Sequence, residues 1–335
     1  MSAETSTWLN QNVLVGMTSK RGNAWHYKAS DQGAEPNHYT GAIPIEDVRR
    51  RLFFWNALEV PMFIADPSSA SGYTEVPNRK AIVRDDSFEV LGVPSSRYVP
   101  HQYDESLLKA VGNIIDDDLV IGSAGLLKNG AIAWVQIEMP ENSKVADVEF
   151  RPNLLATTSF NGSIATTYKR TVTIVVCDNT RTIALREHGQ QISIRHTANS
   201  ALRVQDARTA LNIVHGLEDE FSAQVHKMLN QTVTDQQFEK FINKIVPLKD
   251  AESKQAVTRA DNTKQQLLTL WRDDERSASW KNTAFGALQA VNTHRQHFRN
   301  TRKGNLIVER TMLDSLNGKL QVLDDRAEEI LYSII

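Results

Sequence analysis

The chain has little cysteine, no long apolar run and no excess of basic residues, and each absence excludes a class of protein. A single cysteine, Cys177, cannot form a disulfide within the chain, which excludes a disulfide-stapled fold. No apolar stretch is long enough for a membrane-spanning helix, and the first residues lack the basic and apolar regions of a signal peptide. The net charge of -2 means that any polyanion must bind to a local patch. We expect a cytoplasmic protein with no membrane partner.

Nucleotide, metal and nucleophile motifs are missing as well. The sequence has no GxxxxGK[ST] phosphate loop, no GxGxxG turn and no HExxH pair. Cys177 ends the apolar run TVTIVVC and is interpreted as a small buried residue, with only His188 and His196 near it in sequence as possible bases. Arginine and lysine surround His294 and His297, which disfavours a cation there. We therefore expect no cofactor, no metal and no catalytic residue, and predict that the chain is not an enzyme.

The first half of the sequence is typical of β structure. Asn129-Gly130 and Asn161-Gly162 each separate two β-rich runs, and such dipeptides predict hairpins. Asp85-Asp86-Ser87 predicts the turn of another hairpin. Short helices are expected over 45–56 and 104–115.

The pattern changes to the period of an α-helix near Arg203, from which apolar residues recur at spacings of three and four as far as Met228. Asp178-Asn179 is expected to cap a short helix before this point. Further helices are predicted over 234–246, 250–275, 280–299 and 308–333. The fold class is α+β: an N-terminal antiparallel, hairpin-rich domain with short helices, followed by an α-helical C-terminal half. The predicted parts are an irregular N-terminal arm over 1–40, an α+β core domain over 41–200 and a helical domain over 201–335.

An ordered set of segments resembles an uncharacterised family of phage/plasmid-like proteins. The segments are LGVPSSRYVPHQ (91–102), SAGLLKNGAIAWVQIEMP (123–140), SFNGSIATT (159–167), CDNTRTIAL (177–185), RHT (195–197) and NTAFGALQAVNTHRQH (282–297). The resemblance implies an origin in phages or mobile elements, and hence the cytoplasm of a host cell. It brings no established activity and no catalytic residues.

Basic residues gather between 168 and 208, where few acidic residues oppose them. Positive charge follows phosphates and aromatic rings stack on bases, so this segment is interpreted as a groove for single-stranded DNA. The candidate nucleic-acid-binding residues are Tyr168, Lys169, Arg170, Arg181, Arg186, Arg195 and Arg203. The alternative without a binding function is a solvated face with ordinary salt bridges. The order of strands and helices loosely resembles that of phage annealing recombinases, which is a fold analogy alone.

Two other classes of function stay open. The chain can be an oligomeric assembly or protein-interaction factor without nucleic-acid binding, in which case the long helix from Arg203 would form a seam between copies. A homo-oligomer is expected in either case. A nuclease would need clustered carboxylates for Mg²⁺, and Asp116-Asp117-Asp118 is interpreted as a solvated turn instead.

Overall fold

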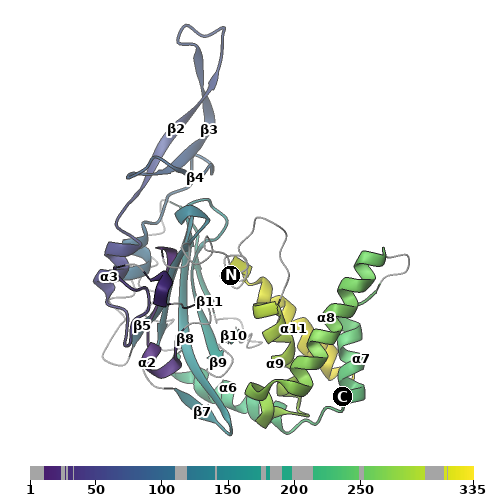
Figure 1. Cartoon of the computed structure of the whole chain (residues 1–335). Coiled ribbons are helices and arrows are strands. Elements are labelled where there is room, and N and C mark those ends of the chain that lie inside the picture. Colours follow the sequence, from purple (N-terminus) through teal and green to yellow (C-terminus); the bar gives the residue numbers. More distant parts are fainter. Residues whose placement is uncertain are drawn as a thin grey trace. The chain divides into compact units, whose positions relative to one another are not determined.

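The structure is a computed structural model that describes most of the chain (Figure 1). The described residues are 11–23, 27, 29–32, 34–109, 119–139, 142–174, 179–181, 191–197, 214–248, 253–298, 313–314 and 316–335. Strands dominate the first half and helices the second, which confirms the α+β fold class. The chain forms two compact units: Met1–Glu141 with Pro152–Thr171 and Glu187–His215, and Asn142–Arg151 with Val172–Arg186 and Gly216–Ile335.

A large antiparallel sheet contains the strands of both predicted Asn-Gly hairpins and further strands from before and after them. Within the described residues its order is β1-β5-β6-β8-β9-β10, with β7 paired to β8 and β11 paired to β9. The strands are β1 (Val13–Val15), β5 (Val120–Leu127), β6 (Ile132–Glu138), β7 (Ser143–Val145), β8 (Val148–Ser159), β9 (Thr166–Ile174), β10 (Asn179–Arg181) and β11 (Gln191–Ile194).

Both hairpins expected at Asn-Gly dipeptides are present, but their connections are longer than two-residue turns. Between β5 and β6 lies the short helix η3 (Lys128–Gly130), where three consecutive residues have a positive φ. A Cβ on Gly130, whose φ is 97°, would lie 2.8 Å from the ring of Trp55, so this turn requires glycine. Between β8 and β9 the chain turns at Gly162, whose φ is 72°.

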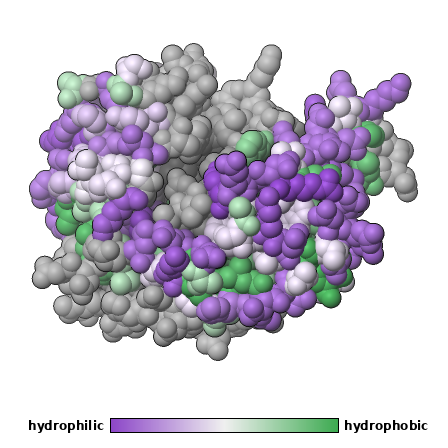
Figure 2. Space-filling model, turned by 60° about the horizontal axis from the view of Figure 1, so that its bottom comes forward, coloured by the Kyte–Doolittle hydropathy of each residue, from purple (hydrophilic) through white to green (hydrophobic). Residues whose placement is uncertain are grey.

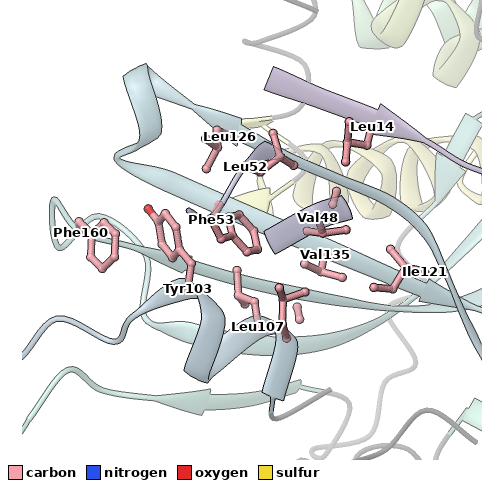
Figure 3. Packing of buried hydrophobic residues seen from close by; sticks show 14 of the residues in the cluster. Leu14, Val48, Leu52, Phe53, Tyr103, Leu107, Ile121, Leu126, Val135 and Phe160 are labelled. Carbon is pink, nitrogen blue, oxygen red and sulfur yellow. The ribbon is translucent and has the colours of Figure 1, made fainter. Parts of the chain in front are cut away.

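The core of the first unit lies between one face of the sheet and two short helices. These are α3 (Ile45–Arg51) and η2 (Asp104–Lys109). Val48 and Leu107 are directed at Ile121 of β5 and Val135 of β6 (Figure 3). Tyr103 stacks on Phe160 with ring centroids 4.1 Å apart.

A three-stranded sheet forms what we call the arm, residues Ala57–Gly92. Its order is β2-β3-β4, with β2 (Ala57–Ala65), β3 (Tyr73–Arg84) and β4 (Val90–Gly92). The ribbon of β2 and β3 extends well beyond the large sheet of its unit (Figure 1). At its base, the Gln102 amide accepts a hydrogen bond from the Ala57 N–H and donates one to the Ala57 carbonyl, both at 2.9 Å. The Arg84 guanidinium lies over the Trp55 ring, with its Cζ 4.0 Å from the ring centroid.

The second unit is largely helical. Its helices are α6 (Val214–Leu229), α7 (Asp235–Ile245), α8 (Lys254–Asp273), η5 (Glu275–Trp280), α9 (Ala284–Thr293), η6 (His294–Phe298) and α11 (Lys319–Tyr332). Thr234 and Gln237 form a reciprocal capping box that begins α7. Phe238 of α7 stacks on Trp271 of α8 with ring centroids 4.5 Å apart. Every residue of α9 is buried, so this helix is central to the core of its unit.

Three sequence expectations need correction. Asn179–Arg181 is the strand β10 and does not begin a helix, because it hydrogen-bonds to β9. The segment over 1–40, expected to be irregular, contains β1, which pairs with β5. The helix expected over 45–56 ends at Arg51, and the chain then leads into the arm.

The surface shown in Figure 2 is mainly hydrophilic where it is described, with smaller hydrophobic patches. None of the described helices combines the length and apolar character needed to cross a membrane. Near the N-terminus, the ring of Tyr27 packs edge-on against that of His38 of the same unit, with ring centroids 4.6 Å apart.

Candidate nucleic-acid interface

Two of the predicted nucleic-acid-binding residues are buried in β9. Tyr168 is 1% exposed and its hydroxyl donates to the Ser106 carbonyl at 2.6 Å, while burial raises the pKa of Tyr168 to about 12. Its ring therefore packs in the core and does not offer a face to a base. Lys169 is 9% exposed. Neither side chain forms part of an open surface in this unit.

The remaining predicted residues divide between described and undescribed positions. Arg195 directly follows β11 and is exposed. Arg170 lies in β9 and Arg181 in β10, but their side chains lie outside the described part of the chain, as do Arg186 and Arg203 altogether.

Arg195 has two arginine neighbours that the sequence interpretation missed. Arg79 forms a β-bridge with Ser95, and the Ser96 N–H donates to the Asn78 carbonyl at 3.0 Å. On the other side, the Val99 N–H donates to the carbonyl of His196, next to Arg195, at 3.2 Å.

A tight turn joins these two contacts. The Tyr98 N–H donates to the Ser95 carbonyl at 3.0 Å, and the ends of such a turn lie within about 7 Å of each other. Arg97 is inside this turn and is exposed. Adjacent backbone segments therefore carry Arg79, Arg97 and Arg195, which we call the arginine patch.

The arginine patch differs from other basic side chains of its unit in its charge environment. Among the described residues, no carboxylate forms an ion pair with Arg79, Arg97 or Arg195; Arg79 donates only to the Val93 carbonyl, at 3.4 Å. By contrast, Arg49 forms an ion pair with Asp104, with 2.7 Å between Nε and Oδ1. The stretches over 94–103 and 191–197 contain no Asp or Glu. Exposed guanidinium groups without carboxylate partners are suited to binding phosphate.

Three aromatic rings stack beside the arginine patch and hold its backbone. The His196 ring lies between those of Tyr98 and His101, with centroids 4.7 and 4.1 Å away. The Tyr98 hydroxyl donates to the Ser159 carbonyl. Because Tyr98 follows Arg97 and His196 follows Arg195, this stack fixes the backbone from which both arginines project.

The polar contacts of the two histidines define their protonation. A carbonyl only accepts, so the 3.1 Å contact between His196 Nδ1 and the Val99 oxygen places a proton on Nδ1. His196 Nε2 is then free to accept from the Thr158 hydroxyl at 3.2 Å. Burial, with a smaller contribution from His101, lowers the pKa of His196 to about 4. His101 contacts Thr166 Oγ1 at 2.6 Å, and burial lowers its pKa as well. The pair is neutral at pH 7 and supports the patch without adding charge.

Chemistry at this site is limited by its residue types. In the described part of the chain, no group of three or more His, Cys, Asp or Glu side chains is placed to hold a metal ion. The expectations for Cys177, His188 and Asp116–Asp118 fall outside the described residues, as does the side chain of His297. His294 lies in the second unit, where its Nε2 is 3.0 Å from Gln266 Oε1.

Three of the segments that carry the family resemblance meet at this stack. Tyr98 and His101 come from 91–102, Thr166 from 159–167 and His196 from 195–197. A Cβ on Gly92 would lie 2.5 Å from Asn161 Cα, so the first two segments approach closely. No curated protein and no solved structure matches the chain. The family model of the domain of unknown function DUF932 matches residues 90–316, which is more than half of the chain, and the chain therefore belongs to that family.

Proposed function

We propose that the chain is a nucleic-acid-binding protein whose arginine patch holds phosphate groups. The observation that carries the proposal is the placement of Arg79, Arg97 and Arg195 on adjacent segments, all exposed and all without carboxylate partners among the described residues. Arg195 is retained from the sequence interpretation. Arg79 and Arg97 replace the buried Tyr168 and Lys169 as candidates.

The finer part of the proposal concerns the kind of nucleic acid. The resemblance to phage/plasmid-like proteins supports a role in phage or plasmid DNA metabolism, with single-stranded DNA as the partner and annealing as the activity. Binding by phosphate contacts alone leaves base edges accessible for pairing with a second strand. The protein would then act without a catalytic step.

The test is fluorescence anisotropy with a labelled single-stranded oligonucleotide over a series of salt concentrations. Three phosphate contacts give a slope of log K against log salt of about -2, so affinity should fall about 20-fold from 50 to 200 mM salt. A variant with Arg79, Arg97 and Arg195 all changed to Gln should lose both the affinity and most of the slope.

A matched control removes the same positive charge from another place. Lys254, Arg259 and Lys264 lie on α8 in the second unit, and their change to Gln should leave the slope unaltered. Equal binding by the patch variant and the original chain, or equal losses in both variants, would contradict the proposal.

The second candidate function is an assembly factor without nucleic-acid binding. One observation favours it: the arm carries large apolar side chains that are exposed, among them Phe63, Ile64, Tyr73, Phe88 and Val90. Exposed apolar surface of this kind marks interaction sites. An assembly that forms without nucleic acid, in a chain that shows no affinity for any oligonucleotide, would favour this function over the first.

A further inference from the structure

The strands of the large sheet share one end, and the arginine patch lies at that end. The register places Ile132, where β6 begins, opposite Ser159, where β8 ends. Ile194, where β11 ends, lies opposite Thr166, where β9 begins. The turn between β5 and β6 and the turn between β8 and β9 are therefore at the same end of the sheet as Arg195, which directly follows β11.

The turn between β8 and β9 lies between two backbone segments of the arginine patch. A Cβ on Gly162 would lie 3.8 Å from the ring of Tyr98, which directly follows one arginine of the patch. On the other side, the pair of Ile194 and Thr166 is the last described pair between β11 and β9, so Arg195 follows at the level of the turn. The turn thus continues the surface that the arginines form.

This turn consists of uncharged residues that can donate hydrogen bonds. Asn161 is half-buried, and Gly162 and Ser163 are exposed. The side-chain oxygen of Asn161 accepts from the Ser163 N–H at 2.9 Å, which holds the turn in shape. The amide N–H groups of Asn161 and the hydroxyl of Ser163 can then donate to another partner. No atom would lie closer than 3.8 Å to a Cβ on Gly162, so a ligand can approach the backbone there.

The segments that meet at this end come from stretches of sequence without acidic residues. The chain contains 40 Asp and Glu residues, but none of them falls within 90–103, 119–137, 152–171 or 191–197. Glu89, just before the first stretch, accepts a hydrogen bond from the Asn129 amide at 2.6 Å. Lys128, in the turn between β5 and β6, is exposed and adds a positive charge. A polyanion at this end would therefore meet cations and neutral donors.

From this arrangement we infer that a single strand of nucleic acid crosses this end of the sheet, from Arg195 over the turn at Gly162 to Lys128. The inference rests on the proposed function and adds a path and two further contacts to it. Three strand spacings separate β6 from β11, roughly 14 Å. This length corresponds to about four nucleotides at the 3.4 Å rise of a stacked strand. Phosphates would meet a cation at each end of the path and uncharged donors in its middle.

Gly162 offers a matched pair of variants in the middle of the path. Asn and Asp have nearly the same shape and both tolerate a positive φ, so the two variants differ chiefly in charge. Gly162→Asn should bind a labelled single-stranded oligonucleotide within about 3-fold of the original chain. Gly162→Asp should bind about 10-fold more weakly at 50 mM salt, because its carboxylate would lie beside a phosphate. The difference should shrink at 200 mM salt, where screening is stronger.

Gly72 provides the control for the added charge. It lies in the turn between β2 and β3 with a φ of 74°, and a Cβ there would meet nothing within 4 Å. This turn is at the far tip of the ribbon (Figure 1), so Gly72→Asp should bind like the original chain. Lys128→Gln should reduce the slope of log K against log salt by about 0.7, the share of one phosphate contact. Lys20→Gln, on α2 (Thr18–Arg21) at the opposite end of the sheet, should leave the slope unaltered.

Fluorescence anisotropy of the full-length forms over one salt series measures all of these effects, and circular dichroism verifies that each variant is folded. With Lys128 as a fourth phosphate contact, the original chain should show a slope of about -3, where the arginine patch alone gives about -2. Equal binding by Gly162→Asp and Gly162→Asn, with the arginine-patch variant still defective, would overturn the path and leave the proposed function standing. An original chain that binds no oligonucleotide would overturn both.

Discussion

The buried histidine beside the arginine patch makes the stability of the first unit depend on pH. His196 is neutral in the folded state, with its pKa lowered to about 4, and an unfolded histidine has a pKa of about 6.5. Above pH 6.5 both states are neutral and the unit has its full stability. As the pH falls from 6.5 to 4, His196 binds a proton in the unfolded state but not in the folded state. The free energy of unfolding therefore decreases across that pH range.

The size of the effect follows from the two pKa values. At pH 5 the unfolded state gains about 2 kcal/mol over the folded state from this proton alone, relative to pH 8. His196→Asn keeps a polar side chain near the Val99 carbonyl and Thr158 but cannot take up a proton. The variant should therefore lose about 2 kcal/mol less than the original chain when the pH is lowered from 8 to 5.

Urea titrations at pH 8 and pH 5 measure this difference in the free energy of unfolding. Tryptophan emission reports on the first unit through the buried Trp55 and Trp134 and on the second unit through the buried Trp271 and Trp280, and the comparison of the two forms isolates the effect of His196. Carboxylates and the other histidines titrate in both forms, so most of their contribution cancels in the comparison. An identical loss of stability in the two forms would refute the assignment of a buried neutral His196.

Three further predictions concern the scaffold, and each is measured as a change in the free energy of unfolding from urea titration. Phe160→Ala should destabilise the first unit by about 3–5 kcal/mol, because a fully buried ring leaves a cavity. Gly125→Ala should cost about 1–3 kcal/mol, since the new Cβ would lie 2.0 Å from the buried ring of Trp134, and no loss would show that the ring can move. Thr234→Ala should cost the second unit about 1 kcal/mol by removing the cap of α7, with Gln237→Ala giving part of the same loss.

Local sequence signals predicted much of the fold. The Asn-Gly dipeptides predicted both hairpins of the large sheet, because few other residues adopt the positive φ that such turns need. The helix expected over 234–246 is α7, where apolar spacing and a capping pair agree. Asn179–Arg181 was harder, since Asp and Asn favour both turns and helix caps, and only pairing with β9 decides for a strand.

The candidate site was predicted less well because exposure depends on partners distant in sequence. Tyr168-Lys169-Arg170 looks like an aromatic and basic run, but the side chains of Tyr168 and Lys169 are buried in the folded unit, and the hydroxyl of Tyr168 donates to the Ser106 carbonyl. Arg97 was overlooked because it is isolated in sequence. The absence of any acidic residue over 94–103 was the signal that could have singled it out.

The amide of Gln102 acts as a substitute peptide group, pinning the first residue of β2 as a neighbouring strand would. The segment from Arg97 to Gln102 therefore carries a guanidinium group and also holds the base of the β2–β3 ribbon. A movement of this ribbon would displace the loop that carries Arg97. Shortening this side chain, as in Gln102→Ala, would weaken the attachment of the ribbon. It would leave unchanged the residues of the arginine patch and the exposed apolar residues of the arm.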